Sequence, residues 1–291
     1  MKKISFHEQI EKNKRDSLML SFFVFLSLLF IIYFFSIIFF HGYTIIVLFF
    51  GIIFSLLYVL NGWLNGDKIV LAATGAKPAV GEKYIQLNNV VEELSIAAGI
   101  PKPKIYVIKS NEMNAFATGR DPHNSSIAIT TGLLEKLNRD ELSGVIAHEM
   151  SHISNYDIRF SMIVATVVGL VVILSHTMLR SFRFRTKGKN SILIIFGILF
   201  VILAPIIVRL IHLAISRKRE YLADSTAAKL TRYPEGLASA LEKIMKTNKG
   251  ELDVSDAVSH MFFVDPKKNV FDELAATHPP IEERIKILRS M

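Results

Sequence analysis

The sequence predicts a membrane protein of the α+β class, with four predominantly transmembrane helices and one water-soluble lobe. Of its 291 residues, 51% are hydrophobic, which is more than is usual for a soluble enzyme. The apolar residues gather into two pairs of long runs, and polar composition returns after each pair. These observations divide the chain into a transmembrane hairpin (1–60), a soluble lobe (61–160), a second hydrophobic hairpin (161–215) and a tail that rejoins the lobe (216–291).

The first hairpin is predicted from two apolar runs, Leu18–Phe40 and Tyr43–Leu60. At about 1.5 Å per residue, the first run is long enough to cross the roughly 30 Å hydrocarbon core of a bilayer. Only His41 and Gly42 separate the two runs, which suits a tight helical hairpin. A cleavable signal peptide is the alternative for the first run. The run is too long for one, lacks a small-residue cleavage site and is followed at once by another span.

The soluble lobe is predicted to mix helices and strands. A helix is expected over Glu82–Ala98, where aliphatic residues recur at helical spacing. Strands are expected over Lys104–Lys109, "KIYVIK", and Ser125–Thr130, "SSIAIT". Amphipathic helices over Gly236–Met245 and Ile281–Leu288 place the tail back in the same lobe.

The second hairpin is predicted from the apolar runs Ser161–Met178 and Ile192–Ile215. Basic residues before the first span predict a cytoplasmic N-terminus and therefore a cytoplasmic lobe. The basic stretch Arg180–Lys189 conflicts with this, because it would lie outside. Either the first hairpin dominates and this stretch is translocated, or the second hairpin does not fully cross. Both possibilities return Asn155 and Arg217 to the same side of the membrane.

Composition excludes two kinds of site. The chain has no cysteine, so a metal must be held by histidine, carboxylate or backbone oxygen. The net charge of +8 would suit nucleic acid, but the basic residues flank the apolar runs and no recognition motif accompanies them. The expected partners are therefore the lipid bilayer and peptide substrates, with no nucleic acid.

The stretch "HEMSH" carries the strongest chemical signal. Asn138 and Glu141 form a capping-box pattern, so a helix is expected to begin there. His148 and His152 are four residues apart and share one helix face, so both imidazoles can reach a single tetrahedral cation. Glu149 lies beside the first histidine, where it can take a proton from the attacking water.

A metal site of this kind needs a third protein ligand. The stretch "SRKREYLADSTAA" follows the fourth apolar run and places Glu220 and Asp224 on one helix face. Glu220 can complete a two-histidine, one-glutamate set, and Asp224 can accept the N–H of a ligand imidazole. A charged helix flanking the membrane is the alternative, and the upstream histidine motif makes it the weaker interpretation. Asp157 is expected to cap a helix or to interact with the following polar turn rather than to be a ligand. His260 is expected to be an ordinary surface or loop residue.

The order of these motifs resembles HtpX-type membrane zinc metallopeptidases, relatives of the eukaryotic prenyl-protein CAAX protease. The matching pieces are "NAFATG", "TTGLLEKL", "HEMSHISNYD", a hydrophobic hairpin, "REYLAD" and "THPPIEERI". The resemblance implies a cytoplasmic zincin-like (gluzincin) lobe with one Zn²⁺ per chain. It implies zinc ligation by His148, His152 and Glu220, with Glu149 as general base and Asp224 orienting an imidazole. It also implies a multi-pass stress-response protease of a bacterial-type inner or plasma membrane that cleaves misfolded or membrane proteins.

The resemblance also suggests how substrate is held. His278 would lie near the scissile carbonyl and stabilise the developing oxyanion, or it is a turn histidine before two prolines. Arg284 would orient a carboxylate there or face solvent. An extended substrate would add as a strand against a wall and an edge strand. The wall and the edge strand would be formed by Asn114–Gly119 and the "SSIAIT" strand, although "SSIAIT" could equally be an interior strand. The residues concerned are Asn114, Ala115, Phe116, Ala117, Ile127, Ala128 and Ile129.

Two other functions remain open at this point. A non-hydrolytic metal-binding membrane scaffold is one, although an intact Glu149 would have no use there. A narrow processing protease of the CAAX type is the other, although such enzymes have additional spans. Zinc itself rests on ligand chemistry and resemblance, because affinity order alone does not exclude copper or nickel.

Overall fold

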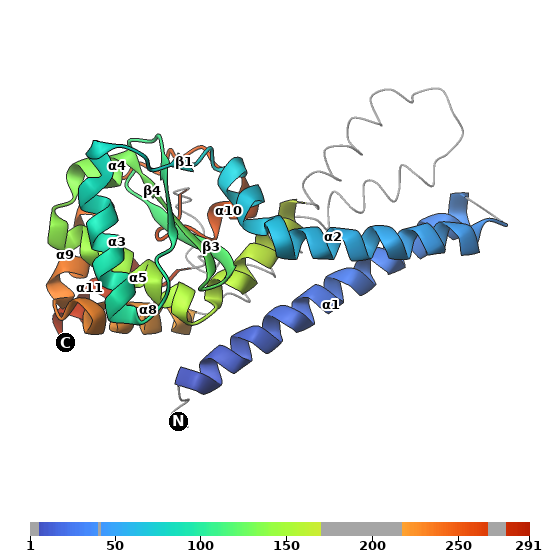
Figure 1. The fold of residues 1–291 in the computed structure, drawn as a ribbon, viewed down its shortest axis with the longest axis horizontal. Coiled ribbons are helices and arrows are strands. Elements are labelled where there is room, and N and C mark those ends of the chain that lie inside the picture. The colour runs from blue at the N-terminus through green and yellow to red at the C-terminus, as the bar shows by residue number, and fades with distance from the viewer. Residues whose placement is uncertain (1–5, 40–41, 170–216, 267–277) are drawn as a thin grey trace.

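The structure is a computed structural model that describes residues 6–39, 42–169, 217–266 and 278–291. Figure 1 shows a lobe of helices around a small sheet, from which two long helices extend to one side. Most of the second predicted hairpin lies outside the described residues. This part includes the polar residues His176, Arg209 and His212 of its apolar runs.

The first predicted hairpin consists of two helices, α1 (Phe6–Phe39) and α2 (Thr44–Ala73), which pack against each other. Both contain a segment long and apolar enough to cross a bilayer, with mean hydropathy 2.1 in α1 and 2.4 in α2. Large apolar side chains such as Phe22 and Ile45 remain exposed on them, as lipid contact requires. These are the two candidate spans within the described residues, so the other two expected spans are not tested.

The second helix runs beyond the expected end of the hairpin at residue 60, as far as Ala73. Its extension packs on the helical residues 157–169. A Cβ placed on Gly66 would lie 2.8 Å from Cγ of Met162, so glycine permits this close approach. The Tyr58 hydroxyl donates to the carbonyl of Thr166 at 2.8 Å. The membrane helices are thus joined directly to the segment that follows the histidine motif.

The sheet has the strand order β1-β2-β4-β3. Its strands are β1 (Lys77–Pro78), β2 (Lys104–Ile108), β3 (Ala115–Asp121) and β4 (Asn124–Thr130). The β2 and β4 strands are parallel, whereas β3 and β4 form an antiparallel pair. The two strands predicted from sequence are confirmed, but the edge position expected for the "SSIAIT" strand is wrong. That strand, β4, has a partner on each side, and β3 forms the edge.

The helices of the lobe pack around α5 (Arg139–Ser154). Buried side chains such as Val145, Ile146 and Met150 place α5 in the main hydrophobic core. Two helices of the C-terminal tail, α8 and α9, pack against it. The other elements are η1 (Glu82–Tyr84), α3 (Ile85–Ala98), α4 (Thr131–Lys136), α8 (Arg217–Thr231), α9 (Pro234–Thr247), α10 (Asp256–Ser259) and α11 (Ile281–Arg289).

Glycines set the close crossing of α5 and α9. A Cβ on Gly144 would lie 2.7 Å from the backbone nitrogen of Leu237. A Cβ on Gly236 would lie 2.7 Å from the carbonyl oxygen of Asp140. Backbone cannot yield as a flexible side chain can, so both positions require glycine. This contact fixes α5, which carries the histidine motif.

Candidate metal centre

The histidine motif lies on α5, whose start is fixed by the predicted capping box. The Asn138 side chain accepts from the Glu141 backbone N–H, and the Glu141 carboxylate accepts from the Asn138 backbone N–H, both at 2.9 Å. Lys243 on α9 contacts the same carboxylate at 2.7 Å. The helix ends at Ser154, and the chain turns sharply at Tyr156, where φ is +61°. The motif therefore occupies the last two turns of a firmly placed helix.

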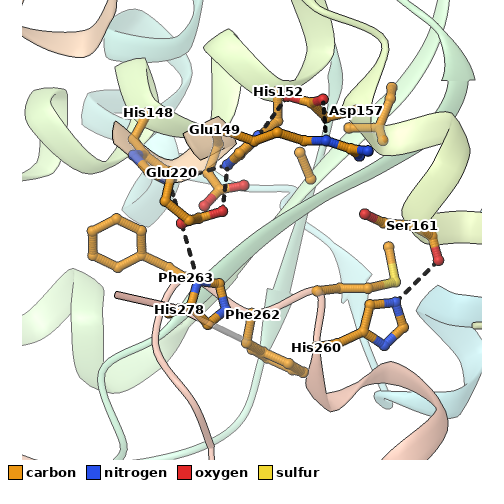
Figure 2. Close-up of a pocket in the computed structure, with 14 residues that line it drawn as sticks. His148, Glu149, His152, Asp157, Ser161, Glu220, His260, Phe262, Phe263 and His278 are labelled. Atoms are coloured by element: carbon orange, nitrogen blue, oxygen red, sulfur yellow. Dashed lines mark hydrogen bonds and ion pairs between the residues drawn. The ribbon is translucent and has the colours of Figure 1, made fainter. Parts of the chain in front are cut away.

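The structure brings three predicted ligands together. The Nε2 atoms of His148 and His152 lie 3.1 Å apart. The carboxylate of Glu220, on α8, lies 3.5 Å from the first and 3.6 Å from the second. The ligating atoms all fall within 4.8 Å of one another. Figure 2 shows Glu220 between the two imidazoles on one side and His278 on the other.

The arrangement fits a cation on chemical grounds. The Nδ1 atom of each imidazole faces a carboxylate, Asp224 for His148 and Asp157 for His152. An Nδ1–H that donates to a carboxylate leaves the Nε2 lone pair as an acceptor. Two such lone pairs and the Glu220 carboxylate then converge in a buried space, where they repel unless a positive charge lies between them. The donor set is therefore suited to a metal ion.

The His148 imidazole is held by a buried ion pair. Its Nδ1 lies 2.9 Å from Oδ1 of Asp224, as the sequence predicted. Arg284 donates to both oxygens of Asp224, at 2.7 and 2.9 Å, and its guanidinium lies over the Phe263 ring. Burial alone would raise the pKa of Asp224, but the Arg284 charge outweighs it and lowers that pKa to about 2.

This contact decides between the two expectations for Arg284. The sequence suggested that Arg284 orients a carboxylate near the site or faces solvent, and its side chain is 1% exposed and lies behind the cluster. The carboxylate that it orients is Asp224 of the same chain. The sequence offered no sign of this, because the two residues lie on different helices, α8 and α11.

The His152 imidazole is held by Asp157, which was expected only to cap a helix. Asp157 Oδ2 lies 3.1 Å from His152 Nδ1. Asp157 reaches the imidazole because α5 stops at Ser154 and the turn at Tyr156 brings the next residue back toward the motif. Burial opposes the charged form of His152, but the Asp157 hydrogen bond and the Glu220 charge outweigh it and raise its pKa to about 9.

Glu149 and His278 lie in the pocket beside the cluster. Glu149 is 2% exposed, and burial raises its pKa even though both histidines act in the opposite direction. His278 Nδ1 lies 3.0 Å from Oε2 of Glu220. The pKa of Glu220 is well below its usual range, because the neighbouring histidines outweigh the effect of burial.

The pocket wall combines the edge strand with apolar side chains. Ala117 of β3, Phe262 and Phe263 line it. His260 also lines it, so the expectation of an ordinary loop residue is wrong. His260 is 3% exposed, and its Nε2 lies 3.1 Å from the carbonyl of Ser161 (Figure 2). The sequence offers no sign of this position, because no other histidine lies at a metal-ligand spacing from His260.

Most of the predicted substrate wall is buried rather than open to a ligand. Ile127, Ala128 and Ile129 are 0% exposed on the interior strand β4. Phe116 is also 0% exposed, and its ring packs edge-on against Phe262.

The start of β3 is occupied by the chain near Phe263. The Asn114 side chain bonds both backbone groups of Val264, and the Ala115 carbonyl accepts from the Phe263 N–H at 2.7 Å. Of the predicted wall residues, Ala117 is the one that lines the pocket.

Known proteins are similar to this chain over most of its length. "Protease HtpX homolog" of Thermoanaerobacter pseudethanolicus is 50% identical over 252 residues, covering 82% of this chain and 84% of the relative. "Protease HtpX homolog" of Dictyoglomus turgidum is 47% identical over 304 residues, covering 100% and 96%. A crystal structure of S. mikatae Ste24p has a similar fold, with a TM-score of 0.50 and 24% identity. The similarity covers 97% of this chain and 66% of the Ste24p chain, so this chain spans less than two thirds of its length.

The family assignment covers the whole cluster. Residues 82–291 match the profile described as "Peptidase family M48". That range includes the histidine motif, the Glu220 helix and the segment that carries His278 and Arg284. Because this match spans more than half of the sequence and agrees with the full-length relatives, the chain belongs to peptidase family M48 and is a metalloprotease.

Proposed function

We propose that the chain is a membrane-integrated zinc endopeptidase that hydrolyses peptide bonds of misfolded or membrane proteins, with its site on the cytoplasmic side of a bacterial membrane. The observation that carries the proposal is the convergence of His148, His152 and Glu220 beside a buried Glu149. A metal-binding scaffold would have no use for a protonatable carboxylate in that position.

Zinc is the ion that suits these donors best. Two imidazoles and one carboxylate form the three-ligand set of catalytic zinc sites, which leave a fourth position for water or substrate. Calcium and magnesium prefer all-oxygen surroundings. When bound, Zn²⁺ would polarise the scissile carbonyl and the attacking water.

Glu149 and His278 are the proposed proton-handling and oxyanion-stabilising groups. Burial raises the pKa of Glu149, so it holds a proton more readily than an exposed glutamate. It can therefore accept a proton from water and pass it to the leaving amine. His278 lines the same pocket and can donate to the oxygen on which negative charge develops. Asp224 and Asp157 keep the two imidazoles in the orientation that binding requires.

Substrate is proposed to add to the edge strand β3 near Ala117. The Ala115 backbone points away from β4, since its carbonyl bonds Phe263 and its N–H bonds the Asn114 side chain. Backbone groups alternate in direction along an antiparallel strand, so those of Ala117 point the same way. Ala117 lines the pocket, so an extended peptide bonded there would pass along the metal centre.

The proposed substrate class follows from the surroundings of the pocket. Phe262 and Phe263 line it, and α2 joins the lobe next to the helix that carries Ser161. A pocket with apolar side chains beside the metal centre, close to the bilayer, suits extended apolar segments, which misfolded and membrane proteins expose and folded soluble proteins bury. The cytoplasmic orientation rests on the basic residues before α1.

Cleavage of unfolded casein by the detergent-solubilised full chain tests this function. Zinc should support cleavage, a chelator should abolish it, and Glu149→Gln should retain one zinc per chain without cleaving. Glu135→Gln makes the same change at an exposed position of α4, and this variant should cleave casein like the unmodified chain. Cleavage by Glu149→Gln would remove Glu149 from the role of base. A zinc-loaded unmodified chain that cleaves nothing would favour the scaffold.

A further inference from the structure

A buried asparagine connects the first membrane helix to the metal centre. Asn13 lies on α1, within the candidate span that begins at Ile10, and is 0% exposed. Its Nδ2 donates to Asp157 Oδ1 at 2.7 Å and to the carbonyl of Asn155 at 2.8 Å. In Figure 1 the N-terminal end of α1 lies on the side of the lobe, whereas its other end lies far out beside α2.

These two bonds use the full donor capacity of the amide. An asparagine side chain has two N–H groups, and both are committed to the turn that ends α5. The carbonyl of Asn155 is one of those that a helix C-terminus leaves without an intrahelical partner. Asn13 therefore caps the histidine helix and holds the carboxylate that follows it.

Asp157 passes this constraint to a metal ligand. One of its oxygens accepts from Asn13, and the other faces His152 Nδ1 at 3.1 Å. Arg219, which precedes Glu220 on α8, lies 3.7 Å from Asp157. The carboxylate is thus positioned between α1, α5 and α8. A donor at hydrogen-bond distance fixes its rotation more closely than the longer ion-pair contact does.

We propose that Asn13 is a positioning residue for the metal site, through which α1 sets the orientation of His152 by way of Asp157. The first transmembrane helix is then part of the machinery that holds the metal as well as an anchor. This inference rests on the proposed function insofar as the cluster binds zinc.

The test compares Asn13→Leu with Ser17→Ala in the full-length chain in detergent. Leucine has nearly the shape of asparagine and lacks both N–H groups. Ser17 lies one turn further along α1 and is also 0% exposed, and its hydroxyl donates to the carbonyl of Asn13 within its own helix. Zinc affinity is measured by competition with a chromophoric chelator, and ligand geometry by the visible absorption spectrum of the cobalt-substituted protein.

Asn13→Leu should weaken zinc binding about tenfold, the lower end of what loss of an outer partner costs a metal site, and should shift the cobalt spectrum. Ser17→Ala should change neither. In an Asp157→Ala background, Asn13→Leu should have no further effect, because its route to His152 has been removed. Unchanged affinity and spectrum in Asn13→Leu would overturn the proposal, as would a full additional loss in the Asp157→Ala background.

Asn13→Ala provides a second variant if the leucine does not fold, since it removes the same donors without added bulk. The results expected for Asn13→Leu, and the results that would overturn the proposal, are the same for this variant. An unmodified chain that binds no zinc would instead count against the proposed function, so the two failures are distinguishable.

Discussion

The two histidines of the metal centre are supported by different parts of the molecule. His148 is backed by Asp224 and Arg284, a buried ion pair contributed by α8 and α11. His152 is backed by Asp157, whose close partner is the neutral amide of Asn13 on a membrane helix. One half of the site is supported from within the lobe, and the other half is contacted by a candidate membrane helix.

This difference has an electrostatic consequence. The Arg284 charge neutralises Asp224, whereas Arg219 lies 3.7 Å from Asp157 and compensates it less directly. The hydrogen bond with Asp157 and the charge of Glu220 outweigh the effect of burial and raise the pKa of His152 to about 9. On the lobe side, the negative charge of Asp224 is therefore neutralised by Arg284 within the protein. On the membrane side, the negative charge of Asp157 is neutralised more fully when a cation binds.

The largest expected effect is on the lobe side. Arg284→Met should lower the free energy of unfolding by about 3–5 kcal/mol, because it leaves the buried Asp224 carboxylate without its partner. Thermal unfolding of the metal-free protein in detergent measures this. Arg289→Met is the matched control on the same helix, since its ion pairs are exposed and the melting temperature should hardly move. Equal shifts in both variants would show that Arg284 has no special structural role.

On the membrane side the effect should appear in metal binding. Asp157→Ala should weaken zinc binding by about 10- to 100-fold, because His152 loses the acceptor that orients its ring. Chelator competition measures the affinity. Asp253→Ala, an exposed aspartate outside the cluster, is the control and should leave the affinity unchanged. If Asp157→Ala bound zinc with full affinity, Asp157 would not support His152 in the way that Asp224 supports His148.

Proton competition gives a further effect of about tenfold per pH unit. A pKa of about 9 means that His152 is protonated below that pH without metal, and zinc must displace the proton. Apparent zinc affinity should therefore rise with pH until about 9, and the stability of the metal-free protein should fall from about pH 6.5 to about 9 as that proton is lost. Binding and melting curves over this range measure both. Affinity that is flat across the range would contradict the raised pKa.

The sequence predicted the parts of the site that depend on local spacing. The capping box at Asn138, the shared face of His148 and His152, and the Glu220 helix follow from residues a few positions apart. The structure places them as expected. Two of the strands, β2 and β4, and the helices α3, α9 and α11 were also predictable from hydrophobic period. The strands β1 and β3 and the order of strands were not.

The contacts that sequence spacing missed cross between distant elements. Asn13 and Asp157 are 144 residues apart, and His260 and Ser161 are 99 apart. The contact between Asp157 and His152 was missed because one residue with positive φ, Tyr156, ends the helical geometry of α5. The sequence left the role of Arg284 open because its partner, Asp224, lies on another helix, and burial of an arginine cannot be recognised without its partner.

The most direct test of the central claim is the zinc content of Glu220→Ala by elemental analysis, beside Glu149→Gln and the unmodified chain. Glu220 is the ligand that unites the α8 helix with the histidine motif. The account predicts one zinc per chain in the unmodified protein and in Glu149→Gln, and none in Glu220→Ala. Full zinc occupancy in Glu220→Ala would contradict it.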